Sequence, residues 1–281
     1  MIKELDLEQA KALVQGINIP VRPAVLQKIM EIQEDVNSDL AQVAKAISSD
    51  VSLSAGVLKT VNSPLYGLKN KISSIQQATS LLGLNNVMNL VISISMRLEI
   101  KGHFNVAVER FWDTANDVAL ISAGIAKHLG TVSADEAYTL GLFHDCGIPL
   151  LIMKDDGYID VLKEANATTD KIFTQVEEEA IATNHTVVGY YVAKSWRIPE
   201  RICLGILNHH EPDMLNSDDH KLNGLIANLK MAESISHSAR RLSDNPEWER
   251  IQDYVFHYLQ ISEKDFFEIK EDLLEKLNEA A

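Results

Sequence analysis

The 281-residue sequence is poor in several features that mark particular protein classes. It has only two cysteines, Cys146 and Cys203, so it lacks the paired cysteines of a disulfide framework. This usage fits a reducing cytoplasm, which is the compartment that we expect. No N-terminal apolar run precedes a small-residue cleavage site, so we read no secretion signal. The longest apolar stretches, near 90–96 and 148–153, are far shorter than a membrane span.

Basic residues are also scarce. The chain has 26 Lys and Arg against 40 Asp and Glu, which gives a formal net charge of −14. Non-specific binding to nucleic acid needs clustered Lys and Arg, and the sequence shows no such cluster. Anionic membrane surfaces are disfavoured for the same reason. We therefore expect neither nucleic acid nor a membrane as a partner.

Glycine and proline are sparse, with 13 and 7 residues, and strand-like alternation is nearly absent. Long segments instead repeat apolar residues with the 3.6-residue period of a helix, so the sequence predicts an all-α protein. A hydrophobic content of 46% suffices for one large core or two smaller ones. Gly102 marks a boundary between an N-terminal helical lobe, 1–102, and a second helical lobe, 103–281.

Apolar spacing and capping residues place the individual helices. Asp39 with Gln42 resembles a capping box, Ser73-Ser74-Ile75-Gln76-Gln77 is a second capping signature, and Gly83 suits the position after a helix end. The segment 87–96 is apolar on nearly every side, which predicts a buried core helix. Asn62-Ser63-Pro64 ends one helix, and Asp244-Asn245-Pro246 opens another. The expected helices cover about 4–15, 23–33, 40–48, 52–61, 74–82, 87–96, 111–125, 137–145, 176–196, 199–210, 222–239, a segment after 246, and an amphipathic acidic tail from 262.

One stretch carries recognisable chemistry. The apolar run 137–143 leads directly into His144 and Asp145. An imidazole nitrogen and a carboxylate oxygen suit a divalent transition metal. Neighbouring helix positions point about 100° apart, so the pair can share one cation or reach two. The dipeptide alone is weak evidence, but further histidines follow at His185 and at 209–210.

Several motifs together resemble the HDOD family, a branch of the HD metal-dependent phosphohydrolase superfamily. In the first lobe they are Asp50-Val51-Ser52-Leu53, Val61-Asn62-Ser63-Pro64, Ser73-Ser74-Ile75 with Ala78, and Leu82-Gly83. In the second they are Phe111-Trp112, Gly141-Leu142-Phe143-His144-Asp145-Cys146-Gly147, Asn184-His185-Thr186-Val187-Val188-Gly189, Trp196-Arg197-Ile198-Pro199 and His209-His210-Glu211-Pro212. The resemblance spans about 15–240. It implies a two-lobed all-α protein, with the N-terminal helical lobe packed on an HD-type helical core.

The resemblance also implies a metal site, because HD-superfamily enzymes bind metals through an early histidine, the His-Asp pair, later histidines and a last aspartate. Matched by position, His144 and Asp145 are the catalytic pair. The implied metal ligands are His144, Asp145, His185, His209, His210 and Glu233. Two positions depart from the pattern. Thr114 stands in the place of the early histidine, and Glu233 replaces the last aspartate. The cofactor implied is a divalent Mn, Fe, Ni, Mg or Zn ion.

The residues leave two interpretations of this cluster open. A single ion could be held by His144, Asp145 and His185, with Glu233 or a water completing the set. Alternatively, these side chains form a buried polar network without metal, in which Asp145 accepts hydrogen bonds from the imidazoles. Of His209 and His210, only one need face inward.

Nearby residues have ordinary interpretations. We expect Glu177 and Glu179 on a solvated helix face, although one of them could orient His185. Cys146 is expected to be a small core residue rather than a nucleophile. The remaining histidines, His103, His128, His220, His237 and His257, have no consistent context.

Two functions follow. The first, which we favour, is a signal-transduction or regulatory protein with a degenerate catalytic site. It would bind an unidentified signalling protein or a small phosphorylated ligand in the cleft between its lobes. The second is a metal-dependent phosphohydrolase acting on a nucleotide or another phosphate ester. The tail from 262 is expected to dock on the body, or else to bind a partner, and the sequence leaves open whether it forms a homodimer.

Overall fold

The structure is a computed structural model that describes residues 5–35, 39–62, 68, 70–100, 106–211, 213–241 and 246–278. These residues form fifteen helices and no strand, which confirms the all-α prediction. Two compact units are present, Met1–Ile19 with His103–Leu274, and Pro20–Gly102 with Glu275–Ala281. The first nineteen residues therefore group with the second expected lobe. Gly102, Ser63, Pro64, Asp244 and Asn245 lie outside the described residues.

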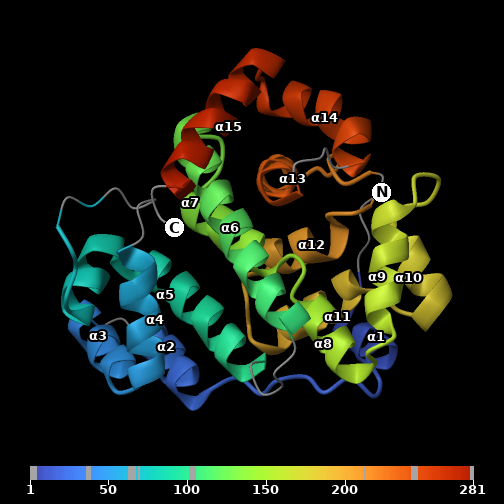
Figure 1. The fold of residues 1–281 in the computed structure, drawn as a ribbon. Helices are drawn as coiled ribbons and strands as arrows, with labels where there is room; N and C mark the ends of the chain where they lie inside the picture. The colour runs from blue at the N-terminus through green and yellow to red at the C-terminus, as the bar shows by residue number, and fades with distance from the viewer. Residues whose placement is uncertain are drawn as a thin grey trace. The chain divides into compact units, whose positions relative to one another are not determined.

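The smaller unit is built around one bent helix. Helices α2 (Ala24–Glu34), α3 (Leu40–Ser48) and α4 (Val51–Val61) all contact α5 (Ile75–Ile100) (Figure 1). Gly83 interrupts α5 with φ 76°, a left-handed conformation that glycine adopts without strain. The arm after Gly83 buries Val87, Leu90, Val91 and Met96, so the predicted core helix is confirmed.

None of the described helices is by itself long and apolar enough to cross a membrane. The two arms of α5 meet that length and composition only together, across a 114° bend.

The larger unit surrounds a central helix and carries the histidines. Helix α13 (His220–Arg241) contacts α6, α7, α12 and α14 (Figure 1). Helix α1 joins this unit through α11, where the Tyr190 hydroxyl donates to the Leu5 carbonyl at 2.6 Å. Helix α9 had no counterpart in the sequence-based prediction. The helices besides α13 are α1 (Leu7–Leu13), α6 (Val106–Leu129), α7 (Ala134–Phe143), α8 (Gly147–Lys154), α9 (Tyr158–Ala167), α10 (Phe173–Ile181), α11 (His185–Ser195), α12 (Glu200–Asn208), α14 (Pro246–Leu259) and α15 (Glu263–Asn278).

The predicted single helix over 176–196 is wrong, because the chain breaks between α10 and α11. Ala182 ends α10 in the left-handed conformation, with φ 57°. Asn184 then caps α11, and its side chain accepts from the Val187 amide at 2.9 Å. Apolar spacing continues across the break, which is why it is invisible to periodicity. The consequence is that His185 is the first residue of a helix rather than the middle of one.

The acidic C-terminal helix α15 docks on the body, as predicted. It buries Phe266, Ile269 and Leu273, and the Leu273 side chain fills the space beside Gly124 of α6. Phe267 is 49% exposed, so the apolar stripe of α15 is narrower than the sequence indicated.

Candidate metal centre

His144 and Asp145 lie in the turn between α7 and α8, just past the last residue of α7. The His144 amide still bonds to the Leu140 carbonyl at 2.8 Å, so the turn continues the helix by one residue. Gly147 then passes against α11, where an added Cβ would lie 2.1 Å from the His185 carbonyl oxygen. No side chain fits there. Glycine at this position therefore lets the turn approach the helix that begins with His185.

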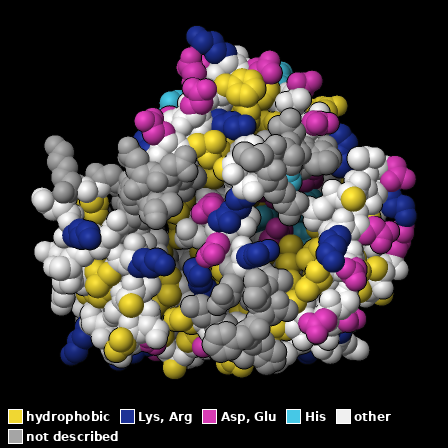
Figure 2. Space-filling model, viewed as in Figure 1, with side chains coloured by type: hydrophobic (Ala, Val, Ile, Leu, Met, Phe, Trp, Pro, Cys, Tyr) yellow, Lys and Arg dark blue, Asp and Glu magenta, His cyan; other side chains and the backbone are white. Residues whose placement is uncertain are grey.

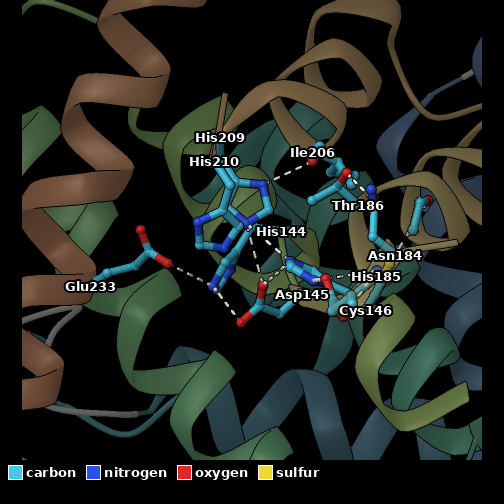
Figure 3. A network of polar contacts seen from close by, with 12 residues as sticks. His144, Asp145, Cys146, Asn184, His185, Thr186, Ile206, His209, His210 and Glu233 are labelled. Carbon is cyan, nitrogen blue, oxygen red and sulfur yellow. Dashed lines mark hydrogen bonds and ion pairs between the residues drawn. The ribbon is translucent and has the colours of Figure 1, made fainter. Parts of the chain in front are cut away.

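The other predicted ligands reach the same place from separate elements, as Figure 3 shows. His209 follows α12 directly as its C-cap, with His210 next, and Glu233 lies on α13. The structure brings all six predicted ligands together but divides them into two groups that share Asp145. One group is Asp145, His185, His209 and His210; the other is His144, Asp145 and Glu233.

The two oxygens of Asp145 face different imidazoles. Oδ1 lies 3.1 Å from Nε2 of His185 and 3.3 Å from Nε2 of His209. Oδ2 lies 3.2 Å from Nε2 of His144, which is also 3.4 Å from Oε1 of Glu233. The two Nε2 atoms of His185 and His209 are 3.5 Å apart. Nitrogen and oxygen atoms thus converge from both sides of one carboxylate.

Hydrogen bonds on the far side of each ring fix which nitrogen carries the proton. Nδ1 of His144 donates to the Gly141 carbonyl at 2.7 Å, and Nδ1 of His209 donates to the Ile206 carbonyl at 2.8 Å. Nδ1 of His185 donates to Glu177 at 2.6 Å. In their neutral forms the three rings therefore direct Nε2 lone pairs at Asp145. Asp145 Oδ1 is buried and would then have no donor, so the site needs a positive charge at its centre.

The preferred solvated face for Glu177 is wrong, and the alternative, that one of the two glutamates orients His185, is confirmed: the Glu177 side chain is fully buried beside His185. Besides the ring nitrogen, it accepts from the His185 backbone amide at 3.2 Å and from the Tyr158 hydroxyl. A carboxylate behind a histidine ligand fixes the ring orientation and raises its basicity. Glu179, in contrast, is 63% exposed and pairs with Lys171, as expected of a surface residue.

The pKa values of the cluster without a metal show how strongly its carboxylates favour a positive charge beside them. Burial would lower the pKa of His185, but Glu177 and Asp145 on either side raise it to about 10. His144 behaves similarly, because Asp145 and Glu233 outweigh its burial and raise its pKa. The imidazoles in turn hold the pKa of Asp145 well below its usual range, against the effect of burial. Two protons or one divalent cation can therefore supply the charge, and the donor set fits both.

His210 is buried rather than on the surface, and it leads to a second charged network. Its Nδ1 lies 3.0 Å from Glu247, while its ring stacks on Phe173 at 5.1 Å between centroids. Burial and the nearby ammonium of Lys230 lower the pKa of His210 to about 4 despite Glu247. His209 has its pKa lowered to about 3 by burial and by His210. Both rings are therefore neutral at pH 7 and able to act as ligands.

Thr114 lines the pocket but supplies no imidazole nitrogen. Its hydroxyl donates back to the Arg110 carbonyl of its own helix at 3.0 Å. The group of His144, Asp145 and Glu233 therefore has three side chains that can ligate a metal. No fourth imidazole is present at the position of the early histidine.

A pocket of about 190 Å³ opens onto this centre from within the larger unit. His144, Asp145, His210 and Glu233 line it, and Figure 2 shows histidine and carboxylate side chains in a hollow on the face turned to the viewer. Three basic side chains, Lys171, Arg240 and Arg250, also line the pocket, as does His237, which the sequence had given no role. Arg240 is held by Asp117 at 2.9 Å, and Arg250 by the Thr169 carbonyl at 3.1 Å.

The HDOD domain model matches residues 19–212. The chain belongs to the HDOD family. An HDOD protein of unknown function from Geobacter sulfurreducens shares 25% identity and a TM-score of 0.72, over 98% of this chain and 95% of its own. A Shewanella amazonensis structure described as a candidate phosphohydrolase has the same fold, with 24% identity and a TM-score of 0.69 over 96% and 93% of the two chains.

A curated relative, an uncharacterized protein of Treponema pallidum, is 25% identical over 201 residues. The match covers 69% of the HDOD chain described here but only 38% of the Treponema protein. The HDOD chain thus spans about two fifths of that relative, so the shared region is one part of a longer protein.

Cys146 is fully buried, which confirms the expected core role. Burial raises the pKa of its thiol, so it stays protonated and unreactive.

Proposed function

We propose that this HDOD protein binds a divalent ion at the His/Asp cluster and a small phosphorylated ligand above it, and that it acts as a regulatory protein. The observation that carries the proposal is the convergence of three Nε2 lone pairs on Asp145 at the floor of a pocket lined by three basic side chains. For Mn, Fe, Ni or Zn ions, a mixed set of imidazole and carboxylate ligands is more suitable than a set of oxygen ligands alone.

The basic side chains give the pocket its preference for anions. Arg250 uses one guanidinium nitrogen on the Thr169 carbonyl, and a guanidinium has further donors that can bind a phosphate. Lys171 and Arg240 are each paired with a carboxylate, which fixes their positions at the pocket wall. A metal at the floor would polarise a phosphoryl oxygen of the bound ligand.

A second function, phosphate-ester hydrolysis, is favoured by one specific feature. His144, Asp145 and Glu233 form a three-donor set that lines the pocket. Three protein ligands with an open position are typical of catalytic rather than structural metal sites. Against turnover stands Thr114, which supplies no donor where the resemblance places a histidine.

The test begins with metal content. Purified protein is dialysed against Mn²⁺, and the bound ion is counted by elemental analysis, in parallel with an Asp145→Asn variant. We expect bound Mn²⁺ in the wild type and little or none in the variant, because Asp145 belongs to both ligand groups. Equal binding by the two proteins would contradict the proposal.

Ligand binding is then measured by calorimetry with inorganic phosphate and adenosine monophosphate as probes. Arg250→Gln should weaken binding about 10- to 100-fold, the effect of losing one charge-assisted bond, and leave Mn²⁺ binding unchanged. Arg110→Gln, an exposed arginine that does not line the pocket, is the matched control. Release of nitrophenol from bis(p-nitrophenyl) phosphate that stops with EDTA and in Asp145→Asn would favour the hydrolase instead.

A further inference from the structure

Lys230 of α13 is buried, with only 2% of its side chain exposed, directly beside the proposed metal centre. Its ammonium lies 3.0 Å from Oε2 of Glu233 and 3.1 Å from Oε2 of Glu247. A buried ammonium is very costly unless it is paired, and here two carboxylates share it. Loss of either carboxylate would leave the buried ammonium with a single partner.

Glu233 connects this ammonium to the ligand cluster. Its Oε2 contacts Lys230, while its Oε1 lies 3.4 Å from Nε2 of His144. One carboxylate thus joins the Lys230 ammonium to a histidine of the ligand cluster. His210 makes a second connection, because its Nδ1 is 3.5 Å from the ammonium and its ring belongs to the group around His185.

We infer that the Lys230 ammonium is a built-in second cation of this centre, that its hold on Glu233 keeps a second divalent ion from binding there, and that the centre holds a single ion. The inference deepens the proposed function and rests on it for the first ion. Sites with two metal ions hold them about 3.5–4 Å apart to neutralise a phosphoryl group from two sides. Lys230 supplies that second charge from the chain itself, so it cannot dissociate.

The ligand count supports the same conclusion. Thr114 leaves the group of His144, Asp145 and Glu233 one donor short, and Lys230 already takes up half of the Glu233 carboxylate. A second ion at that group would therefore have His144 and Asp145 as ligands, and would share Glu233 with the Lys230 ammonium. In the group of Asp145 and three histidines the ammonium approaches only Nδ1 of His210, at 3.5 Å, and takes up no carboxylate, so we place the single ion there.

The experiment compares the number of ions bound by Lys230→Gln and by the wild type, using native mass spectrometry and elemental analysis after dialysis against Mn²⁺. We expect one additional ion per chain in Lys230→Gln, because Glu233 is released to act as a full ligand. The double variant Lys230→Gln, Glu233→Gln should lose that gain. Lys221→Gln, an exposed lysine on the same helix, should bind as the wild type does.

The comparison stays decisive if Lys230→Gln folds poorly. Its melting temperature is then measured in EDTA and in Mn²⁺, and a rise with Mn²⁺ larger than that of the wild type supports the inference. No gain of ions and no larger rise would overturn it, as would two ions in the wild type. A wild type without metal removes the proposed function and this inference with it, whereas a wild type with one ion and no gain in Lys230→Gln removes this inference alone.

Discussion

Replacing Glu177 by glutamine tests the architecture of the centre at a residue that no ligand would touch. The Glu177 carboxylate has three donors around it, the Tyr158 hydroxyl and the backbone and ring N–H groups of His185. Glutamine keeps one oxygen but replaces the other by an NH₂ group. With the NH₂ group at the Oε2 position, the ring N–H of His185 faces another donor; with it at the Oε1 position, the backbone N–H of His185 keeps only its 3.4 Å contact to the remaining oxygen.

The magnitude follows from these contacts. Losing one charge-assisted hydrogen bond costs about 1.5–3 kcal/mol, and leaving a buried donor unpaired costs about 1–3 more. The sum, about 2.5–6 kcal/mol, brackets the roughly 3–5 kcal/mol that breaking a buried ion pair costs. His185 can avoid the clash only by moving its proton to Nε2, and that tautomer has no lone pair for a metal. We therefore also expect metal affinity to fall about 10- to 100-fold.

Glu179→Gln is the matched control, since Glu179 lies on the same helix and makes only an exposed pair with Lys171. Such an exposed, solvent-screened pair contributes little to stability, so this variant should unfold like the wild type. The assays are urea denaturation in EDTA and calorimetric titration with Mn²⁺. If Glu177→Gln matched Glu179→Gln in both, the orientation of His185 would not depend on its buried carboxylate and the reasoning would be refuted.

Three further predictions concern the elements that position the site. Gly147→Ala should lower the free energy of unfolding by more than about 3 kcal/mol, because its Cβ would meet the His185 backbone at 2.1 Å. In the control Gly157→Ala the Cβ would meet only the Asp155 side chain, at 3.1 Å, so the loss measured by denaturation should be under about 1 kcal/mol. Leu273→Ala should cost about 2–4 kcal/mol and loosen α15 in hydrogen exchange, whereas exposed Phe267→Ala should not. Burial would raise the pKa of Asp219, but Arg201 at 3.0 Å and the α13 amides lower it. Asp219→Asn should therefore lower the free energy of unfolding by about 0.5–1 kcal/mol at pH 7. This difference from the wild type should disappear as the pH falls through the lowered pKa. A difference unchanged between pH 7 and pH 3 would contradict the last.

The helices were predictable where local signals and burial agree. Asp39 and Ser74 accept from the amides three residues later, as their capping patterns indicated. The apolar segment 87–96 is buried on nearly every side of the helix. The break at Ala182 was missed because apolar spacing runs through it, although Asn184 was a usable signal for a new helix start.

That break also explains why a solvated helix face was preferred for Glu177 over the alternative that it orients His185. In one continuous helix, Glu177 and His185 would lie eight residues and about 12 Å apart along the axis, beyond contact. The left-handed residue at 182 turns the chain back and brings the carboxylate onto the ring. Lys230 gave a signal that went unused, a lysine inside the apolar run 225–232 and three residues before Glu233. Glu247 gave none, because only the packing of α14 on α13 brings it there.

The three imidazole rings around Asp145 are held in two different ways. The difference determines which of the rings a side-chain substitution can reorient. His144 and His209 each follow the end of a helix, where the last-turn carbonyl three residues earlier accepts from Nδ1. Those carbonyls are orphan acceptors of a helix C-terminus, and no substitution removes them. His185 begins a helix instead, and a helix N-terminus offers only N–H groups. Its ring therefore needs a side-chain acceptor, so among these three histidines the orientation of His185 depends on the Glu177 carboxylate.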